Sequence, residues 1–274
     1  MNEKFVSLPP DYHTHTALCK HAEGQPCDYL AIARRKGLRE IAATDHCPTP
    51  YDYDPEHRME MNQFEIYKNW VNVARIENDC MVLFGVEADY FEGCKPFMSE
   101  WLSQYPFDLV LGSVHYLGSL NMADPDDLSL WESPDVNAVW QRYFALMGEM
   151  ADTKLYDVVT HFDLPKRGGD RPRDRDLPDL VLPALDRIAR AGMAIEINTS
   201  GLRHPISEMY PAPQILAWAR EREIDITFGS DAHTPENVAS NFDRALECAR
   251  EAGYTHSVRF RRRRRKKIPL PVTS

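Results

Sequence analysis

Histidines and carboxylates recur where short apolar runs end, and they are the residues of this sequence best suited to chemistry. Seven of the ten histidines lie at or just beyond such a run. Chance placement would scatter them through helices and loops, so we expect them to meet at one metal-binding site. The candidate metal ligands are His13, His15, His21, His46, Glu87, His115, His161, Asp231 and His233.

The spacing of these residues suits metal coordination. In extended chain, residues two apart project to the same side, so His13 and His15 can reach one ion, and Asp231 and His233 repeat that spacing. Imidazole together with carboxylate favours zinc, iron or manganese over calcium or magnesium. Nine ligands are too many for one ion with an open position. They predict two or three divalent ions, with Glu87 as the best bridging ligand because a carboxylate has two oxygens to share.

Short apolar runs alternate with amphipathic stretches, which is typical of β/α units and a parallel sheet. The predicted strands are Pro10–His13, Glu40–Thr44, Met81–Val86, Phe107–Val114, Tyr156–Thr160, Ala194–Asn198 and Asp225–Gly229. The predicted helices are Cys27–Lys36, Met61–Glu77, Phe97–Ser103, Pro134–Thr153, Leu177–Ala191, Pro213–Arg222 and Pro235–Ala252. Pro134 and Pro235 suit first helical turns, and Gly37, Gly192 and Gly253 follow expected helix ends.

Seven such units predict an α/β fold with a closed or nearly closed, irregular barrel, built as a single domain over residues 1–274. In such barrels the active site forms at the carboxyl ends of the strands, where the candidate ligands lie. The first strand is the least regular, because Pro9 and Pro10 cannot donate hydrogen bonds to a sheet.

The charge distribution opposes broad nucleic-acid binding, which usually needs a basic face. The formal net charge is −10, and removing the seven basic residues of the run Arg261–Lys267 takes it to −17. That run predicts either a solvated edge, some of it paired with the acidic body by strand alternation, or a contact with nucleic acid or an acidic partner.

The remaining bulk features predict a cytoplasmic protein that does not enter membranes. No apolar run approaches the roughly 18 residues that span a bilayer. The six cysteines form no CxxC pair and are expected to be reduced thiols, although Cys19 and Cys47 lie near candidate ligands and could reach a metal. The sequence does not indicate an oligomeric state.

These motifs resemble the PHP family, the polymerase and histidinol phosphatase family, over nearly the whole chain. DYHTHT, TDH, GVE, GSVH, THFD and GSDAH appear in the family's order. The longer segments GSVHYL, THFDLPKR, EINTSGLRHP and GSDAHTPENV resemble its histidinol-phosphatase branch. The resemblance implies a distorted (β/α)7 barrel that hydrolyses L-histidinol phosphate, a small phosphorylated substrate, at a trinuclear site. The implied metal sets are His13, His15, Glu87 and Asp231; Glu87, His115 and His161; and His21, His46 and His233.

Further residues are candidates for substrate binding and proton transfer. Arg203 is the first choice for gripping phosphate, because its planar fork can bond two oxygens, and Lys166 and Arg167 come next. His204 is a candidate to protonate the leaving alkoxide, and Asp45 could orient His46 or contact the substrate. Asp89 and Tyr90 are candidates for the groups that recognise the imidazole and amine of the substrate.

Three other functions remain open at this point. One is a metal-binding protein without catalysis, which the presence of all nine candidate ligands opposes. Another PHP-type phosphoesterase, acting on nucleotides or on phosphotyrosine proteins, would use the same metal site. A DNA-processing module would use the basic run Arg261–Lys267, but the acidic remainder of the chain opposes it.

Overall fold

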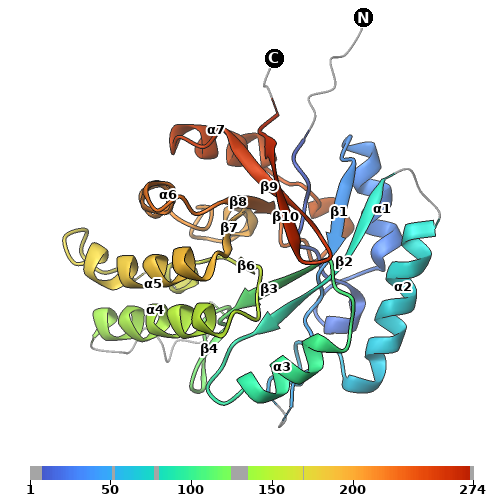
Figure 1. Ribbon diagram of the computed structural model, residues 1–274, viewed down its shortest axis with the longest axis horizontal. Coiled ribbons are helices and arrows are strands. Elements are labelled where there is room, and N and C mark those ends of the chain that lie inside the picture. Colours follow the sequence, from blue (N-terminus) through green and yellow to red (C-terminus); the bar gives the residue numbers. More distant parts are fainter. Residues whose placement is uncertain (1–7, 51–52, 77–79, 125–134, 169, 272–274) are drawn as a thin grey trace, which may run out of the picture.

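The computed structural model describes residues 8–50, 53–76, 80–124, 135–168 and 170–271 (Figure 1). Their α-helices are α1 (Pro26–Arg35), α2 (Phe64–Ile76), α3 (Lys95–Ser103), α4 (Val136–Thr153), α5 (Leu177–Ala191), α6 (Pro213–Glu221) and α7 (Phe242–Glu251). Their strands are β1 (Glu40–Ala43), β2 (Met81–Asp89), β3 (Leu109–Ser113), β4 (Tyr116–Leu117), β5 (Leu120–Asn121), β6 (Val158–Val159), β7 (Ala194–Asn198), β8 (Ile226–Gly229), β9 (His256–Arg261) and β10 (Arg264–Pro269). Within these ranges, no helix has both the length and the apolar character required to cross a bilayer.

Six strands form one parallel sheet in the order β1-β2-β3-β6-β7-β8. Their residues are almost all buried, as expected for a parallel sheet covered on both faces. The sheet curls, and the helices lie around its outside (Figure 1). This arrangement places all the strand carboxyl ends on one rim.

The segment before the first helix completes the ring. The Tyr12 amide donates to the Phe228 carbonyl in β8 (3.0 Å), and the Ala42 amide in β1 donates to the Asp11 carbonyl (2.8 Å). The predicted strand Pro10–His13 therefore lies between the two edges of the sheet, although it forms isolated parallel bridges rather than a regular strand. The irregular seven-unit barrel is confirmed in this form.

Predicted and observed element boundaries agree for α5 and β7, and Gly192 ends α5 with a left-handed φ of 72°. The predicted helix Pro235–Ala252 is wrong as one element. It divides into a 3₁₀ turn, η6 (Pro235–Asn237), and α7, because the Ala239 amide turns inward to donate to Asp11 Oδ2 (2.8 Å). Pro134, the predicted start of α4, lies outside the described residues.

The β9–β10 hairpin, which the sequence analysis did not predict, covers the opposite, amino-terminal mouth of the barrel. Val258 and Phe260 of β9 join the inward-facing strand residues Leu83 and Leu111 in one buried cluster. The Phe260 ring meets Tyr12 edge-to-face, with the centroids 6.0 Å apart. The hairpin thus supplies the apolar floor of the barrel.

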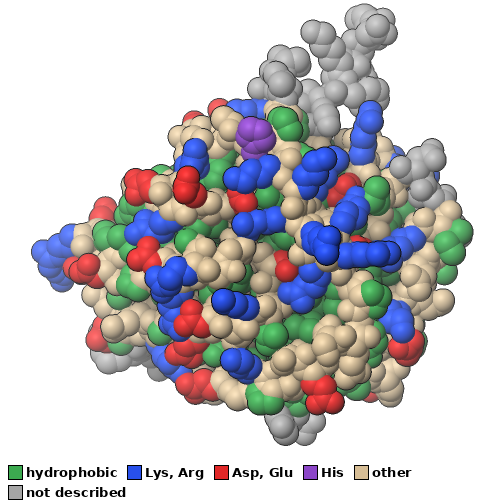
Figure 2. All heavy atoms as spheres, viewed as in Figure 1, with side chains coloured by type: hydrophobic (Ala, Val, Ile, Leu, Met, Phe, Trp, Pro, Cys, Tyr) green, Lys and Arg blue, Asp and Glu red, His purple; other side chains and the backbone are tan. Residues whose placement is uncertain are grey.

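The basic run Arg261–Lys267 forms half of this hairpin, and several of its members pair with carboxylates just before or at strand starts. Arg261 binds Glu40 (3.0 Å), Arg263 binds Asp157 (2.7 Å), and Lys267 binds Asp225 (2.9 Å). Lysine and arginine side chains gather on this face of the molecule, with acidic side chains between them (Figure 2). Strand alternation accounts for Arg265 and Lys267 of β10, which both pair with Asp225, whereas Arg263 reaches Asp157 from the turn of the hairpin. Arg262, Arg264 and Lys266 are exposed.

Candidate metal centre

All nine predicted ligands lie at the carboxyl-end rim of the barrel. Glu87 is part of β2, and the others follow strand ends or the closing segment 11–14. In the described part of the chain, four groups of side chains have ligand atoms within 4.8 Å of one another. These groups are His13, His15 and Glu87; His46, Glu87 and His115; His21, His46 and His233; and His15, Cys19 and His233.

Glu87 lies at the centre of the cluster and is almost fully buried. Its Oε2 is 3.2 Å from His13 Nε2 and 3.1 Å from His46 Nδ1. Its Oε1 is 3.1 Å from His161 Nε2 and 3.5 Å from His115 Nε2. The two oxygens face different imidazoles, which is the geometry that a bridging carboxylate needs.

Asp231 faces the same centre from the far end of the chain. Its Oδ1 is 3.2 Å from His15 Nε2 and 3.7 Å from His13 Nε2. Its backbone is left-handed, with φ 52°, a conformation that costs energy for a residue other than glycine and is concentrated at functional sites. Beside it, His233 Nε2 lies 3.0 Å from His21 Nε2.

Several of the histidines are oriented through Nδ1 so that Nε2 faces the centre. His13 Nδ1 lies 2.7 Å from Glu196 Oε1, and His115 Nδ1 lies 2.9 Å from Asp89 Oδ1. A carboxylate only accepts, so each Nδ1 carries the proton and each Nε2 keeps a free lone pair. Metal-bound histidines in proteins are usually held in this way.

The orienting roles of Glu196 and Asp89 were missed by the sequence analysis. Asp89 is completely buried, so it does not lie on the rim as a group for the substrate. Strand alternation could have indicated the role of Asp89, because Asp89 follows Glu87 by two residues in β2 and so projects to the same side.

The glycine before Ser230 and Asp231 is required by close packing at this rim. A Cβ on Gly229 would lie 1.8 Å from Glu196 Oε1 and 2.7 Å from His13 Cβ. Any side chain there would push away the carboxylate that orients His13, so the GSDAH motif needs glycine at its first position.

The buried polar atoms of the cluster fit divalent cations. Among the residues that the structure describes, no hydrogen-bond partner meets the buried ring nitrogens His13 Nε2, His15 Nδ1 and Nε2, His46 Nδ1 and His161 Nδ1. Such orphaned atoms are rare in folded proteins unless an ion or water satisfies them. Burial by itself would raise the pKa of Glu87, but the imidazoles of His13, His46 and His115 outweigh burial and hold that pKa well below its ordinary value. The cluster therefore keeps Glu87 as a negative carboxylate in a position where bound cations would balance its charge.

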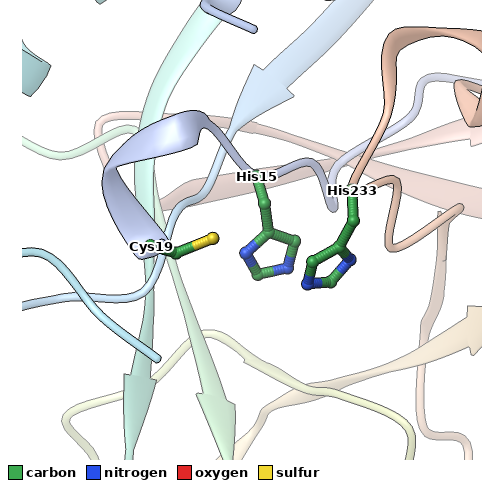
Figure 3. A group of neighbouring side chains, drawn as sticks. All are labelled: His15, Cys19 and His233. Carbon is green, nitrogen blue, oxygen red and sulfur yellow. The ribbon is translucent and has the colours of Figure 1, made fainter. Parts of the chain in front are cut away.

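Cys19 lies on the outer side of His15 in the 3₁₀ turn η1 (Ala17–Cys19). Its sulfur points toward the His15 ring, and that ring stacks on His233 with the centroids 4.1 Å apart (Figure 3). Burial raises the pKa of the Cys19 thiol. Cys19 is thus placed to contact a metal ligand, whereas Cys47 belongs to none of the ligand groups among the described residues.

Asp45 lies behind the ligands instead of facing the cavity. It is completely buried, accepts a hydrogen bond from the Thr16 hydroxyl, and approaches His15 Nδ1 at 3.6 Å. We expected Asp45 to orient the ring of His46, but Asp45 bonds the backbone amide of His46 (2.8 Å) and not its ring. Its position therefore suits orientation of His15 and not contact with a substrate.

A cavity of about 570 Å³ opens above the cluster, and Arg167, Arg203 and His204 line one side of it. Arg203 Nη2 donates to the Ser230 and Asp231 carbonyls (2.7 and 2.9 Å), while its Nη1 is buried without a partner. A buried, unsatisfied guanidinium N–H next to the metal cluster is suited to bind an anion.

His204 accepts a hydrogen bond from Arg167 through Nδ1 at 3.3 Å. Burial and the charge of Arg167 lower the pKa of His204 to about 4. The ring is therefore neutral near neutral pH, with its proton on Nε2, which suits it to donate a hydrogen bond to phosphate more than to act as an acid.

Lys166 does not line the cavity. Its ammonium is almost fully buried and forms an ion pair with Asp163 at 2.9 Å. Lys166 therefore forms a structural ion pair below the loop and does not make the predicted contact with phosphate. Tyr90 also lies outside the cavity, with its hydroxyl 3.4 Å from Glu149.

The PHP domain family matches residues 11–200 of this chain. The Deinococcus radiodurans protein called probable histidinol-phosphatase is 38% identical over 256 residues, which cover 93% of this chain and 97% of that protein. The Bacillus subtilis histidinol-phosphatase is 27% identical and covers 86% of this chain and 98% of its own length.

A crystal structure of the Lactococcus lactis histidinol phosphate phosphatase, in complex with zinc, L-histidinol and phosphate, shares the fold with a TM-score of 0.81 at 21% identity. It covers 94% of this chain and 99% of the Lactococcus chain. The distorted parallel barrel is therefore the architecture of that protein also.

Proposed function

This chain belongs to the PHP family, and on that premise we propose that it hydrolyses L-histidinol phosphate to L-histidinol and phosphate, a late step of histidine biosynthesis. The observation that carries the proposal is its 38% identity, over nearly the full length of both chains, to the Deinococcus relative that bears that name. Residues 1–274 then form one phosphoesterase domain, which we place in the cytoplasm with the other enzymes of amino-acid biosynthesis.

We assign the metal ligands as three sets, two of which share the Glu87 carboxylate. Two or three ions of zinc, iron or manganese would be held by the nine rim residues, with Glu87 between two of the sets. When bound, the ions would supply charge neutralisation for the phosphoryl group and acidify the attacking water. The sets are His13, His15, Glu87 and Asp231; Glu87, His115 and His161; and His21, His46 and His233.

The residues of the chain bind and orient the phosphate. Arg203 offers its unpartnered Nη1, and Arg167 contributes a second guanidinium whose Nε is also buried without a partner. His204 is fixed by Arg167 with its Nε2–H free, so it donates to a phosphate oxygen. Glu196 and Asp89 keep His13 and His115 in the required orientation.

The rival phosphoesterase activities are tested by substrate preference. The metal-loaded enzyme should hydrolyse L-histidinol phosphate with a kcat/KM at least about 100-fold above that for nucleotides, phosphotyrosine peptides or p-nitrophenyl phosphate. Asp231→Asn is the control, because it removes one rim carboxylate and should abolish turnover of every substrate. Equal rates for L-histidinol phosphate and p-nitrophenyl phosphate would end the substrate assignment.

The nucleic-acid rival loses its main support in the hairpin. Arg261, Arg263 and Lys267 are paired with carboxylates of the barrel, so the basic run has a structural role inside the molecule.

A further inference from the structure

The cavity above the metal centre has two chemically different sides. Arg167, Arg203 and His204 come from the loops after β6 and β7 and form a cationic side. Asp54, His57 and Tyr116 come from the loop after β1 and from β4, and form the other side. The order of strands in the barrel separates these sources, so a bound phosphate monoester would meet one side with its phosphate and the other with its leaving group.

Asp54 and His57 form a hydrogen-bonded pair on this second side. His57 Nδ1 lies 2.6 Å from Asp54 Oδ1, so the carboxylate fixes the proton on Nδ1 and leaves Nε2 as an acceptor. Among the described residues, no hydrogen-bond partner occupies Nε2, and the ring is 44% exposed in the cavity wall. By accepting from Nδ1, Asp54 fixes the tautomer and the orientation of the ring, as carboxylates do for metal-bound histidines.

Asp54 is held rigidly in this orientation. Its side chain is 7% exposed and bonds Arg58 (2.7 Å) and the Tyr116 hydroxyl (2.9 Å). Its backbone φ is 50°, which is unfavourable for a residue other than glycine. The buried Arg58 also binds Asp89 (3.2 Å), the carboxylate that orients His115. The pair is thus anchored to the frame of the metal centre.

His57 is also close to the reacting end of the cavity. Its ring meets His21 edge-on, with the centroids 5.3 Å apart, and His21 belongs to the group with His46 and His233. A group held next to His57 would therefore lie only a few bonds from a phosphorus atom bound at the centre. In L-histidinol phosphate the ammonium group is carried by the second carbon from the ester oxygen, which satisfies this requirement.

We propose that His57, positioned by Asp54, is a specificity residue that accepts a hydrogen bond from the ammonium group of the leaving alcohol. This inference rests on the proposed function and names the residue that distinguishes a cationic leaving group from an aryl or nucleoside one. An imidazole acceptor backed by a carboxylate favours a charged N–H donor, and it offers nothing to a neutral aromatic ring.

The test compares His57→Phe with the unchanged protein on three substrates: L-histidinol phosphate, its analogue without the amino group, and p-nitrophenyl phosphate. His57→Phe should lower kcat/KM for L-histidinol phosphate by about 10- to 100-fold, as expected for a lost hydrogen bond to a charged group. The two substrates without an ammonium group should change by less than about threefold. His57→Gln, which keeps an acceptor, should recover part of the loss, and His256→Phe on the exposed start of β9 is the matched control.

Each other result overturns the proposal. An equal loss with the deaminated analogue would show that His57 does not contact the ammonium group, and an equal loss with p-nitrophenyl phosphate would show that it acts through the metal centre. An unchanged preference in His57→Phe would show that it makes no specific contact. Failure of the proposed function is a separate result, since the unsubstituted enzyme would then show no preference for L-histidinol phosphate.

Discussion

Both mouths of the barrel carry buried or partly buried carboxylates, but the negative charge of these carboxylates is balanced differently at each mouth. At the amino-terminal mouth, Glu40, Asp108, Asp157 and Asp225 lie at or just before strand starts, and each has an arginine or lysine partner. At the carboxyl-terminal mouth, Glu87 and Asp231 face imidazole nitrogens that lack hydrogen-bond partners. One mouth is completed by the chain's own cations, and the other is arranged to receive cations from solution.

This difference separates the stability of the protein from its chemistry. The hairpin β9–β10 closes the first mouth with an apolar floor and paired charges, so substitutions there should act on folding. The second mouth leaves ligand atoms unsatisfied, so substitutions there should act on metal content and turnover. Three substitutions test this separation of stability from chemistry.

The largest effect is expected from Glu87→Gln at the open mouth. Loss of the central carboxylate charge should lower kcat/KM by at least about 10³-fold, which corresponds to roughly 4 kcal/mol of transition-state stabilisation. Metal analysis of the purified variant should show fewer bound ions per chain. Glutamine has the same shape, so the circular dichroism spectrum should not change. A variant with normal metal content and normal turnover would remove Glu87 from the centre.

The next effect is expected from Phe260→Ala at the closed mouth. Phe260 is 2% exposed within the apolar floor, and its truncation should lower the free energy of unfolding by about 3–5 kcal/mol. Denaturant titration measures this loss, while kcat/KM at low temperature should stay within about twofold. Ile76→Ala is the control, because Ile76 is 83% exposed and its removal should change stability by less than about 0.5 kcal/mol. A large fall in turnover with unchanged stability would contradict the division.

The smallest effect is expected from Arg263→Ala, which leaves Asp157 buried without its cation. The loss of stability should be about 1–3 kcal/mol near neutral pH. Burial already raises the pKa of Asp157, and removal of Arg263 would raise it further. A carboxyl group with a raised folded-state pKa loses stability as the pH rises through that pKa, so the deficit should be small in acid and grow toward neutral pH.

Arg264→Ala provides the matched control for this pH series, because Arg264 is exposed in the same hairpin. Its thermal unfolding should differ little from that of the unchanged protein at every pH. If both arginine variants lost the same stability, pairing with Asp157 would not be the way in which Arg263 stabilises the fold.

The barrel and the nine rim residues are predictable from the sequence because both have local signals. Each ligand follows a short apolar run, and the carboxyl ends of parallel strands must share a rim. Element boundaries followed from capping and turn residues such as Gly192, and they failed at Pro235–Ala252, where a contact with the distant Asp11 interrupts the helix.

The features that the sequence did not indicate depend on residues far away along the chain. The hairpin was hidden because the apolar alternation of β9 is limited to Val258 and Phe260, and because Arg261 and Lys267 pair with carboxylates more than 40 residues away. His57 lies in a loop without periodicity, and its role depends on the exact position of Asp54. Lys166 follows a predicted strand end, but only the folded loop shows that it turns inward to Asp163.

The closing segment 11–14 also has a consequence for the order of assembly during synthesis. The Ser230 amide and hydroxyl bond the side chain of Asp11, across 219 residues, and His13 meets Asp231 at the same junction. Such non-local pairings form late, because loop-closure entropy opposes them until the intervening chain is in place. The nascent chain therefore exposes its earliest histidines until β8 has left the ribosome, and metal capture at the complete centre is one of the last steps of maturation.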